Sequence, residues 1–386
     1  MMSNLLNKIS ASCVLMLASA SLQAQAPRQI EYRKNATVQE WKSSPTPTVD
    51  RLKGFKLRKA DPATDQYGGW KSESYEATGF FRTQKVGDRW WLVDPEGHPY
   101  IFKGVAVFSV GNSDRQRKAL QERFGTRQNW ADSEMEKLRS MGFNGLGAWS
   151  SVKEVRASDN PMPYTVIVSP MGRYHGVHLK RYGGKYLQHG WQNYRFDLAM
   201  VFDPEFDKYV DSELARIEEY KDDPWLVGYF TDNEIPWVRD ALDRHLTLLA
   251  HDEPGYLAAR KWLDERKGKG ARVEDITPED REAFNAFYLD TYLSKVTKAL
   301  RRHDTNHLYL GCRFNQWREE LTSKTMFEVA GKYMDNDPED LKTDPSNRDS
   351  NKGMVKWNFE PYPELLERMQ QFNDRTYRLI KYIDEH

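Results

Sequence analysis

Five short apolar segments limit what this chain can fold into more than any other feature of its sequence. They cover residues 100–108, 143–149, 164–168, 224–230 and 307–313. Each is too short for an ordinary helix and lacks the polar alternation of a half-exposed strand, which is typical of strands covered on both faces. Segments of helical pattern lie between them, at residues 131–141, 203–220 and 278–302. This alternation predicts parallel βα units, which form either a doubly wound sheet or a (β/α)8 barrel.

Other segments divide the chain into a leader and one large α/β domain. We expect residues 27–75, which are polar, to drape over the fold, and residues 76–386 to form the domain. The domain begins with a predicted β-hairpin around Val86-Gly87-Asp88, because two strand-like runs flank this turn. A helical insertion is predicted at residues 238–265, and further helices at 323–331 and 363–383.

The N-terminal 26 residues predict export. A short positive start precedes an apolar run at residues 11–22, and Ala24-Gln25-Ala26 is a typical cleavage signal, so we expect a signal peptide and a secreted or periplasmic protein. Basic and acidic residues both total 57, so there is no net charge to attract nucleic acid. No later run reaches the roughly 18 apolar residues of a membrane span. We expect no cofactor and no metal.

Polar residues at the ends of the predicted strands indicate a sugar site. Parallel strands present their carboxyl ends at one edge, so these residues should lie together. Trp149 offers a flat face, Asn233 and Asn315 offer amides that recognise hydroxyl groups, and Glu234 offers a proton. An oligosaccharide combines hydroxyl groups with apolar ring faces, and its hydrolysis needs an acid on the leaving oxygen and a second carboxylate.

Three longer motifs resemble agarase-like enzymes, as in glycoside hydrolase family 50. They are Arg89-Trp90-Trp91-Leu92-Val93-Asp94-Pro95-Glu96-Gly97, Gly228-Tyr229-Phe230-Thr231-Asp232-Asn233-Glu234 and Gly311-Cys312-Arg313-Phe314-Asn315. The resemblance covers roughly residues 76–386 and implies a TIM barrel, a retaining mechanism and a β-linked galactan such as agarose as substrate. It also implies that Glu234 is the general acid/base and that Asn233 holds a hydroxyl near the cleaved bond.

The same resemblance exposes an apparent gap. Such families carry their nucleophile, a Glu, at the end of strand seven, and we find no such strand. After Tyr333 the sequence runs into the acidic segment 334–340, and too few residues remain for three more βα units, which need roughly 90. We therefore expect an incomplete barrel with an internal deletion near residue 333. Asp232 and Glu360 are substitutes for the nucleophile, and surface hydrogen bonding or helix capping is the alternative for both.

The other candidates for substrate or metal binding are weaker, and each has a structural alternative. Trp237 and Trp317 are either subsite platforms or ordinary packing residues. His178, with two other histidines at 175 and 189, matches no zinc spacing, so we expect a sugar contact. Asp335 opens a segment like the start of a calcium loop, but the loop lacks its Gly and terminal Glu, so a solvated acidic turn is preferred.

These observations predict an exported glycosidase-type protein that binds β-galactan chains. If the nucleophile is missing, the oxocarbenium-like transition state would lose several kcal/mol of stabilisation, at roughly the level that electrostatic groups supply in active sites. Two other functions therefore stay open. One is a non-catalytic carbohydrate-binding remnant, and the other is an envelope interaction protein that uses its aromatic grooves for protein ligands.

Overall fold

The structure of this chain is a computed structural model. It describes residues 28–32, 39–46, 63–87, 89–111, 113–181, 194–314 and 323–335. The chain divides into two units, residues 1–61 with 360–386 and residues 62–359. In the first unit, strands β1 (Arg28–Tyr32) and β2 (Lys42–Thr46) pair antiparallel, where the sequence predicted only a polar leader. The signal segment, Asn315, Trp317, Glu360 and the helix expected at 363–383 lie outside the described residues.

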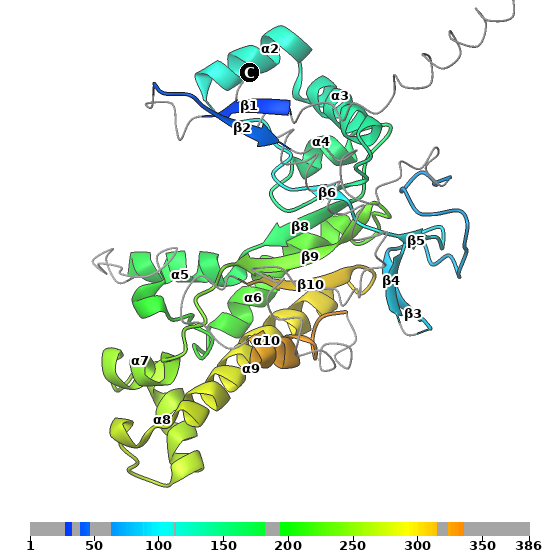
Figure 1. The fold of residues 1–386 in the computed structure, drawn as a ribbon. Helices are drawn as coiled ribbons and strands as arrows, with labels where there is room; N and C mark the ends of the chain where they lie inside the picture. Colours follow the sequence, from blue (N-terminus) through cyan, green and yellow to red (C-terminus); the bar gives the residue numbers. More distant parts are fainter. Residues whose placement is uncertain are drawn as a thin grey trace, which may run out of the picture. The chain divides into compact units, whose positions relative to one another are not determined.

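The second unit contains a five-stranded parallel sheet. Its strands are β6 (Gly104–Val105), β7 (Gly145–Leu146), β8 (Tyr164–Val168), β9 (Leu226–Asn233) and β10 (Leu308–Arg313). They lie side by side in chain order (Figure 1), without the reversal that marks a doubly wound sheet. The predicted parallel α/β architecture is thus confirmed. In the part of the chain that the structure describes, β6 and β10 are the two edges of the sheet and do not pair with each other.

Helices lie between these strands, and α10 follows the last of them. They are α2 (Asp114–Phe124), α3 (Arg127–Ser140), α4 (Val152–Arg156), α5 (Pro170–Arg181), α6 (Phe206–Leu214), α7 (Ala241–Leu248), α8 (Pro254–Lys267), α9 (Pro278–His303) and α10 (Ser323–Ala330). Short 3₁₀ turns lie at η3 (Arg195–Asp197), η4 (Ala215–Tyr220) and η5 (Val273–Asp275). The long helix α9 starts where its sequence predicts, because Thr277 and Asp280 form a capping box around Pro278.

Helix α9 fixes one face of the sheet. Its Tyr292 hydroxyl lies 3.1 Å from the Thr231 hydroxyl of β9, and Thr231 in turn lies 2.7 Å from the Tyr309 hydroxyl of β10. At the C-terminal end of α9, Asp304 accepts a 2.6 Å hydrogen bond from Tyr229. All these hydroxyl groups are buried and have partners, as a covered sheet face requires. Figure 1 shows α9, α6 and α10 along this side of the sheet.

The opposite face is filled at the amino-terminal ends of β9 and β10. Leu308 and Leu310 flank Tyr309 and therefore point away from α9. They join a buried cluster with Tyr67, Phe81 and Tyr100, which come from the segment before the sheet. That segment forms a small antiparallel sheet of β3 (Arg82–Val86), β4 (Arg89–Val93) and β5 (Pro99–Tyr100).

Two expectations from the sequence are wrong. The apolar run 100–108 is not one strand, because its start pairs with β4 while Gly104 and Val105 pair with β7. Between them the Asn144 side chain replaces the strand ladder, donating to Ile101 O at 2.9 Å and accepting from Lys103 N at 2.7 Å. The segment 170–195 is rich in His, Tyr and Gly, a composition that predicts irregular structure, but it begins with helix α5.

Candidate active site

The carboxyl-terminal edge of the sheet carries an unusual backbone. Val107, Trp149, Asp232 and Glu234 all have φ between 54° and 62° although none is glycine. Each lies at or just after the end of β6, β7 or β9. Left-handed backbone is unfavourable for residues with a side chain, above all for a β-branched valine, and such strain concentrates at functional sites. Among the described residues, the edge predicted to hold the site therefore carries four of the six non-glycine residues with left-handed backbone, and the other two, Phe196 and Asp197, lie in η3.

Glu234 is fixed at this edge by the neighbouring strand. Its backbone N–H donates to Arg313 O of β10 at 2.8 Å, so the register of β9 and β10 determines where Glu234 lies. The residue is half-buried. A carboxyl group that is anchored through its backbone and still reaches solvent has the access that proton transfer to a bound substrate requires.

Arg313 joins the predicted site residues into one group. Its Nη1 donates to Asn233 Oδ1 at 3.1 Å, and its guanidinium carbon lies 4.3 Å from the centre of the Trp149 ring. Burial lowers the pKa of Arg313, and the nearby charge of Glu234 acts in the opposite direction. Trp149 is 45% exposed, which leaves much of its ring surface open to solvent. The structure thus brings Trp149, Asn233 and Glu234 together, as the strand-end pattern predicted.

Sequence reasoning missed the role of Arg313. The signal was present, since a charged residue ends an otherwise apolar strand two positions before the predicted Asn315. A strand-end arginine has many common explanations, such as a surface ion pair. Only the contacts with Asn233 and Trp149 separate this one from those.

Asp232 faces the protein interior instead of the open edge. Its carboxylate accepts hydrogen bonds from Met171 N at 3.0 Å, Gly172 N at 2.9 Å and the Tyr292 hydroxyl at 2.7 Å. It is 1% exposed, and burial raises its pKa to about 6 although the three donors act against that rise. Asp232 thereby satisfies the free N–H groups at the start of α5. This role leaves the carboxylate unsuited to act as the nucleophile, the substitute role considered from the sequence.

Two other candidates lie in different surroundings. The Trp237 side chain is fully buried, with its ring centre 5.1 Å from that of Tyr288 and 5.6 Å from that of Tyr292. The expectation of a substrate platform at Trp237 is therefore wrong, and the packing alternative holds. His178 is 2% exposed on α5, with Nε2 3.4 Å from an Asp203 oxygen, and lines a small cavity of about 50 Å³. None of Trp149, Asn233 and Glu234 lines that cavity, which argues against a sugar contact for His178 at this site.

Asp335, the first acidic residue of the segment 334–340, takes part in a structural contact. Its carboxylate pairs with Arg301 of α9 and accepts from Tyr309 N of β10 at 2.6 Å. The later residues of that segment lie outside the described residues. The contacts of Asp335 join the chain after α10 to both α9 and β10.

Known proteins resemble this chain in sequence and in fold. No family model matches it. Beta-agarase B from Vibrio sp. (strain JT0107) is 23% identical over 378 residues, an alignment that covers 70% of this chain and 38% of the relative. The chain thus spans well under half of that relative's length. Its sequence resembles a beta-agarase.

Three solved structures share the fold. BpGH50 matches with a TM-score of 0.61 and 24% identity, covering 80% of this chain and 69% of its own. The agarase AgWH50C has a TM-score of 0.54 and 23% identity, covering 70% of this chain and 47% of its own. A structure described as an exo-beta-agarase has a TM-score of 0.55 and 21% identity, covering 71% and 51%. The resemblance to family 50 agarases that the motifs predicted is therefore confirmed.

Proposed function

We propose that this chain is a glycoside hydrolase that acts on β-linked galactans such as agarose, with Glu234 as its general acid/base. The convergence of Trp149, Asn233, Glu234 and Arg313 at the carboxyl-terminal edge of the sheet carries this proposal. These side chains combine a stacking face, an amide and a proton donor, which is what recognition and cleavage of a sugar chain need. The similarity to beta-agarase B supports galactan as the substrate class.

Arg313 organises the binding surface in this proposal. Because it donates to Asn233 Oδ1, it orients the amide so that the Asn233 NH₂ group can donate to a sugar hydroxyl. Because it lies over Trp149, it supports one side of that ring and leaves the exposed side for the apolar face of a pyranose. Its guanidinium also interacts electrostatically with Glu234, the residue proposed to donate and then accept the proton in a retaining reaction.

The proposed fold is a (β/α)8-type barrel that lacks an internal segment. Five strands in chain order support the barrel type. The alignment with beta-agarase B runs over 378 residues but covers only 70% of this chain, so the relative has residues within that span without counterparts here. This difference supports a deletion within the aligned span. The sequence pattern after Tyr333 is the reason to place it near residue 333, where we expect the nucleophile to be lost.

Carbohydrate binding without cleavage is the second candidate function. The interior position of Asp232 favours it, since the acid nearest to Glu234 along the strand is committed to α5 and α9. A retaining mechanism needs a second carboxylate at about 5 Å from the first. An envelope interaction protein that binds proteins through the same aromatic edge is the third candidate.

Export is part of the proposal. The positively charged start, the apolar run and the Ala24-Gln25-Ala26 sequence support a signal peptide, and an extracellular or periplasmic location suits a polymer substrate. None of the helices within the described residues combines the length and the apolar character that a bilayer span requires.

Reducing-end release from agarose, together with retention in galactan affinity gels, tests these alternatives. If the chain is an active hydrolase, Glu234→Gln should lower its rate roughly 10²- to 10⁴-fold, the usual contribution of a general acid/base. The exposed Glu136→Gln on α3 is the matched control and should keep full activity. Unchanged turnover in Glu234→Gln would refute the assignment.

The other outcomes separate the alternative functions. Retention in galactan gels without any product supports the binding protein, and that retention should weaken in Trp149→Ala. If a panel of polysaccharides shows neither retention nor cleavage, the sugar site is ruled out. That outcome supports the third candidate function, an envelope interaction protein.

A further inference from the structure

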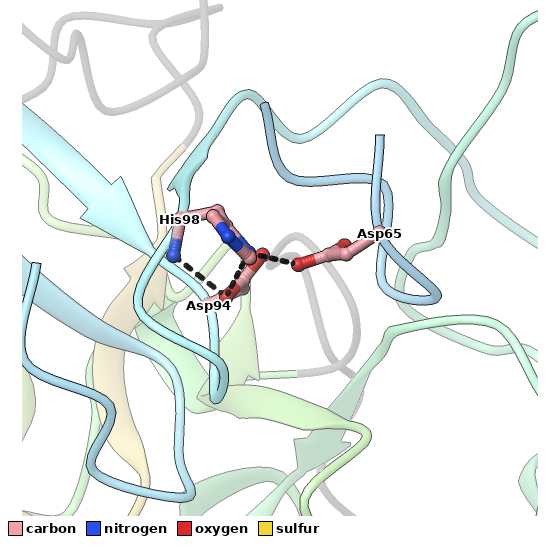
Figure 2. A group of neighbouring side chains, drawn as sticks. All are labelled: Asp65, Asp94 and His98. Carbon is pink, nitrogen blue, oxygen red and sulfur yellow. Dashed lines mark hydrogen bonds and ion pairs between the residues drawn. The ribbon is translucent and has the colours of Figure 1, made fainter. Parts of the chain in front are cut away.

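A buried cluster of Asp65, Asp94 and His98 lies away from the proposed sugar site. Figure 2 shows the three side chains converging, Asp65 from the segment before β3 and the other two from the turn between β4 and β5. His98 Nδ1 is 2.6 Å from Asp65 Oδ2, and one ligand atom of each residue lies within 4.8 Å of the others. The side chains of Asp65 and Asp94 are 1% and 0% exposed. Two carboxylates are thus buried side by side, which is costly without a compensating positive charge.

The backbone already occupies one oxygen of each carboxylate. Asp65 Oδ1 accepts the N–H groups of Tyr67, Gly68 and Gly69, each at 2.9 Å. Asp94 Oδ1 accepts from Glu96 N at 2.9 Å and His98 N at 3.0 Å. These bonds fix both carboxylates in orientation, as outer hydrogen bonds do around metal ligands. The second oxygens are left to face the cluster.

Asp94 Oδ2 is the atom that points to a ligand. It is fully buried, and no N–H or O–H group of the described residues donates to it. The polar group beside it is the Asp65 carboxylate, which cannot donate while ionised. Gly69 provides the space, because a Cβ there would lie 1.8 Å from Asp94 Oδ2 and 2.8 Å from the His98 Cβ.

We propose that Asp65, Asp94 and His98 form a structural binding site for a divalent transition-metal ion of the Zn²⁺ type. Two carboxylates and a neutral imidazole together balance a charge of +2. A mixed set of one nitrogen and few oxygens suits Zn²⁺, whereas Ca²⁺ and Mg²⁺ prefer six or more oxygens. The His98 side chain is 16% exposed, which gives the ion a route from solvent and a place for a water as fourth ligand.

The site would join two segments of the domain. Tyr67, two residues after Asp65, packs in the core cluster with Phe81 and Tyr100. An ion held between Asp65 and the turn at 94–98 therefore fastens the segment before β3 onto the amino-terminal side of the parallel sheet. Its binding energy would add to folding stability, because the ligands converge only in the folded chain.

Zinc binding by the full-length chain, produced without a polyhistidine tag, tests the proposal. Metal content after dialysis against Zn²⁺ should approach one ion per chain. The melting temperature should lie about 5 °C or more above that measured with a chelator. Ca²⁺ and Mg²⁺ should give smaller shifts.

Four variants decide where the ion binds. Asp94→Asn and His98→Gln should weaken Zn²⁺ binding at least tenfold and abolish the melting shift. Glu96→Gln, which removes an exposed carboxylate from the same turn, should behave like the unchanged protein. His178→Gln should also leave binding intact, because His178 belongs to a different cluster with Asp203 and Glu205.

The rival explanation is one proton shared between Asp65 and Asp94. An asparagine at position 94 can donate to Asp65 and would replace that proton, so Asp94→Asn would then keep full stability while no zinc binds at all. Absence of stoichiometric zinc in the unchanged protein overturns the proposal, and so does zinc that is lost in His178→Gln but kept in His98→Gln. If a variant fails to fold, the zinc titration of the unchanged protein still decides whether the site binds an ion.

Discussion

The two ends of the parallel sheet differ in what they hold. At the amino-terminal end, Leu308 and Leu310 are buried against Tyr67, Phe81 and Tyr100, and the rings of Tyr67 and Phe81 meet edge to face with centres 5.8 Å apart. The carboxyl-terminal end instead carries left-handed backbone, a half-exposed Trp149 and the polar group around Arg313. Apolar side chains pack at the amino-terminal end of the sheet, whereas left-handed backbone and polar side chains occur at the carboxyl-terminal end. This is the division between stability and chemistry that barrel enzymes show.

Truncating one aromatic side chain at each end should give the largest contrast. Tyr100 is 1% exposed and donates to Asn144 O at 2.7 Å, so Tyr100→Ala should lower the free energy of unfolding by about 3–5 kcal/mol. Trp149→Ala should cost less than about 1 kcal/mol, because nearly half of the side chain is already in water. Chemical denaturation measures both values. Equal losses would show that the two ends do not divide stability and chemistry in this way.

Replacing an acceptor oxygen of Asp232 with an amide group should give an intermediate effect. In Asp232→Asn an amide N–H group faces the N–H donors of α5, so we expect a loss of about 1–3 kcal/mol. Tyr292→Phe removes only the hydroxyl donor and should cost about 1 kcal/mol. Denaturation curves compare the two variants, and a larger loss for Tyr292→Phe would contradict the anchoring role of Asp232.

The pH dependence of stability tests the same group with a definite sign. Burial raises the pKa of Asp232 from 3.8 to about 6, so the folded chain holds this proton more tightly than the unfolded chain does. Its contribution to stability is present below pH 4 and is lost as the pH rises to 6. The stability difference between the unchanged protein and Asp232→Asn should therefore narrow from pH 4 to pH 7. A widening difference would mean that the three hydrogen bonds outweigh burial.

The smallest expected effect concerns Arg313. Arg313→Lys keeps a positive charge but loses the flat group over Trp149 and the fixed donor to Asn233. We expect roughly a three- to tenfold loss of galactan affinity, in line with a cation–π contribution of about 1 kcal/mol, and little change in stability. Calorimetric titration with agaro-oligosaccharides measures it. An affinity equal to that of the unchanged protein would remove Arg313 from the binding surface.

Local patterns in the sequence were enough to predict much of the fold. Buried strands such as Tyr164–Val168 and capped helices such as α9 carry their own signals, so their places were predictable. Strand ends then placed Trp149, Asn233 and Glu234 on one edge, because that rule needs only the direction of parallel strands. This rule was enough to predict that the three side chains lie at the same edge of the sheet, although it does not predict their contacts.

Contacts between distant residues could not be predicted in this way. Helix α5 looked irregular because its first N–H groups are satisfied by Asp232, about 60 positions later in the chain. Trp237 resembled a platform until its burial against α9 was known. The pairing of Asp65 with His98 likewise joins a loop to a turn, and each segment alone looks like ordinary turn chemistry.

The filled amino-terminal face of the sheet has a consequence for how such folds can change. In a closed ring, the same circle of strands both hides apolar side chains and aligns the loops that bear catalytic groups. Here Tyr67, Phe81 and Tyr100 hide the apolar side chains at the amino-terminal end of the sheet. A sheet whose amino-terminal end is covered in this way does not need further strands to shield that cluster from water, so evolution or a protein engineer can alter the other strands without first solving the problem of collapse.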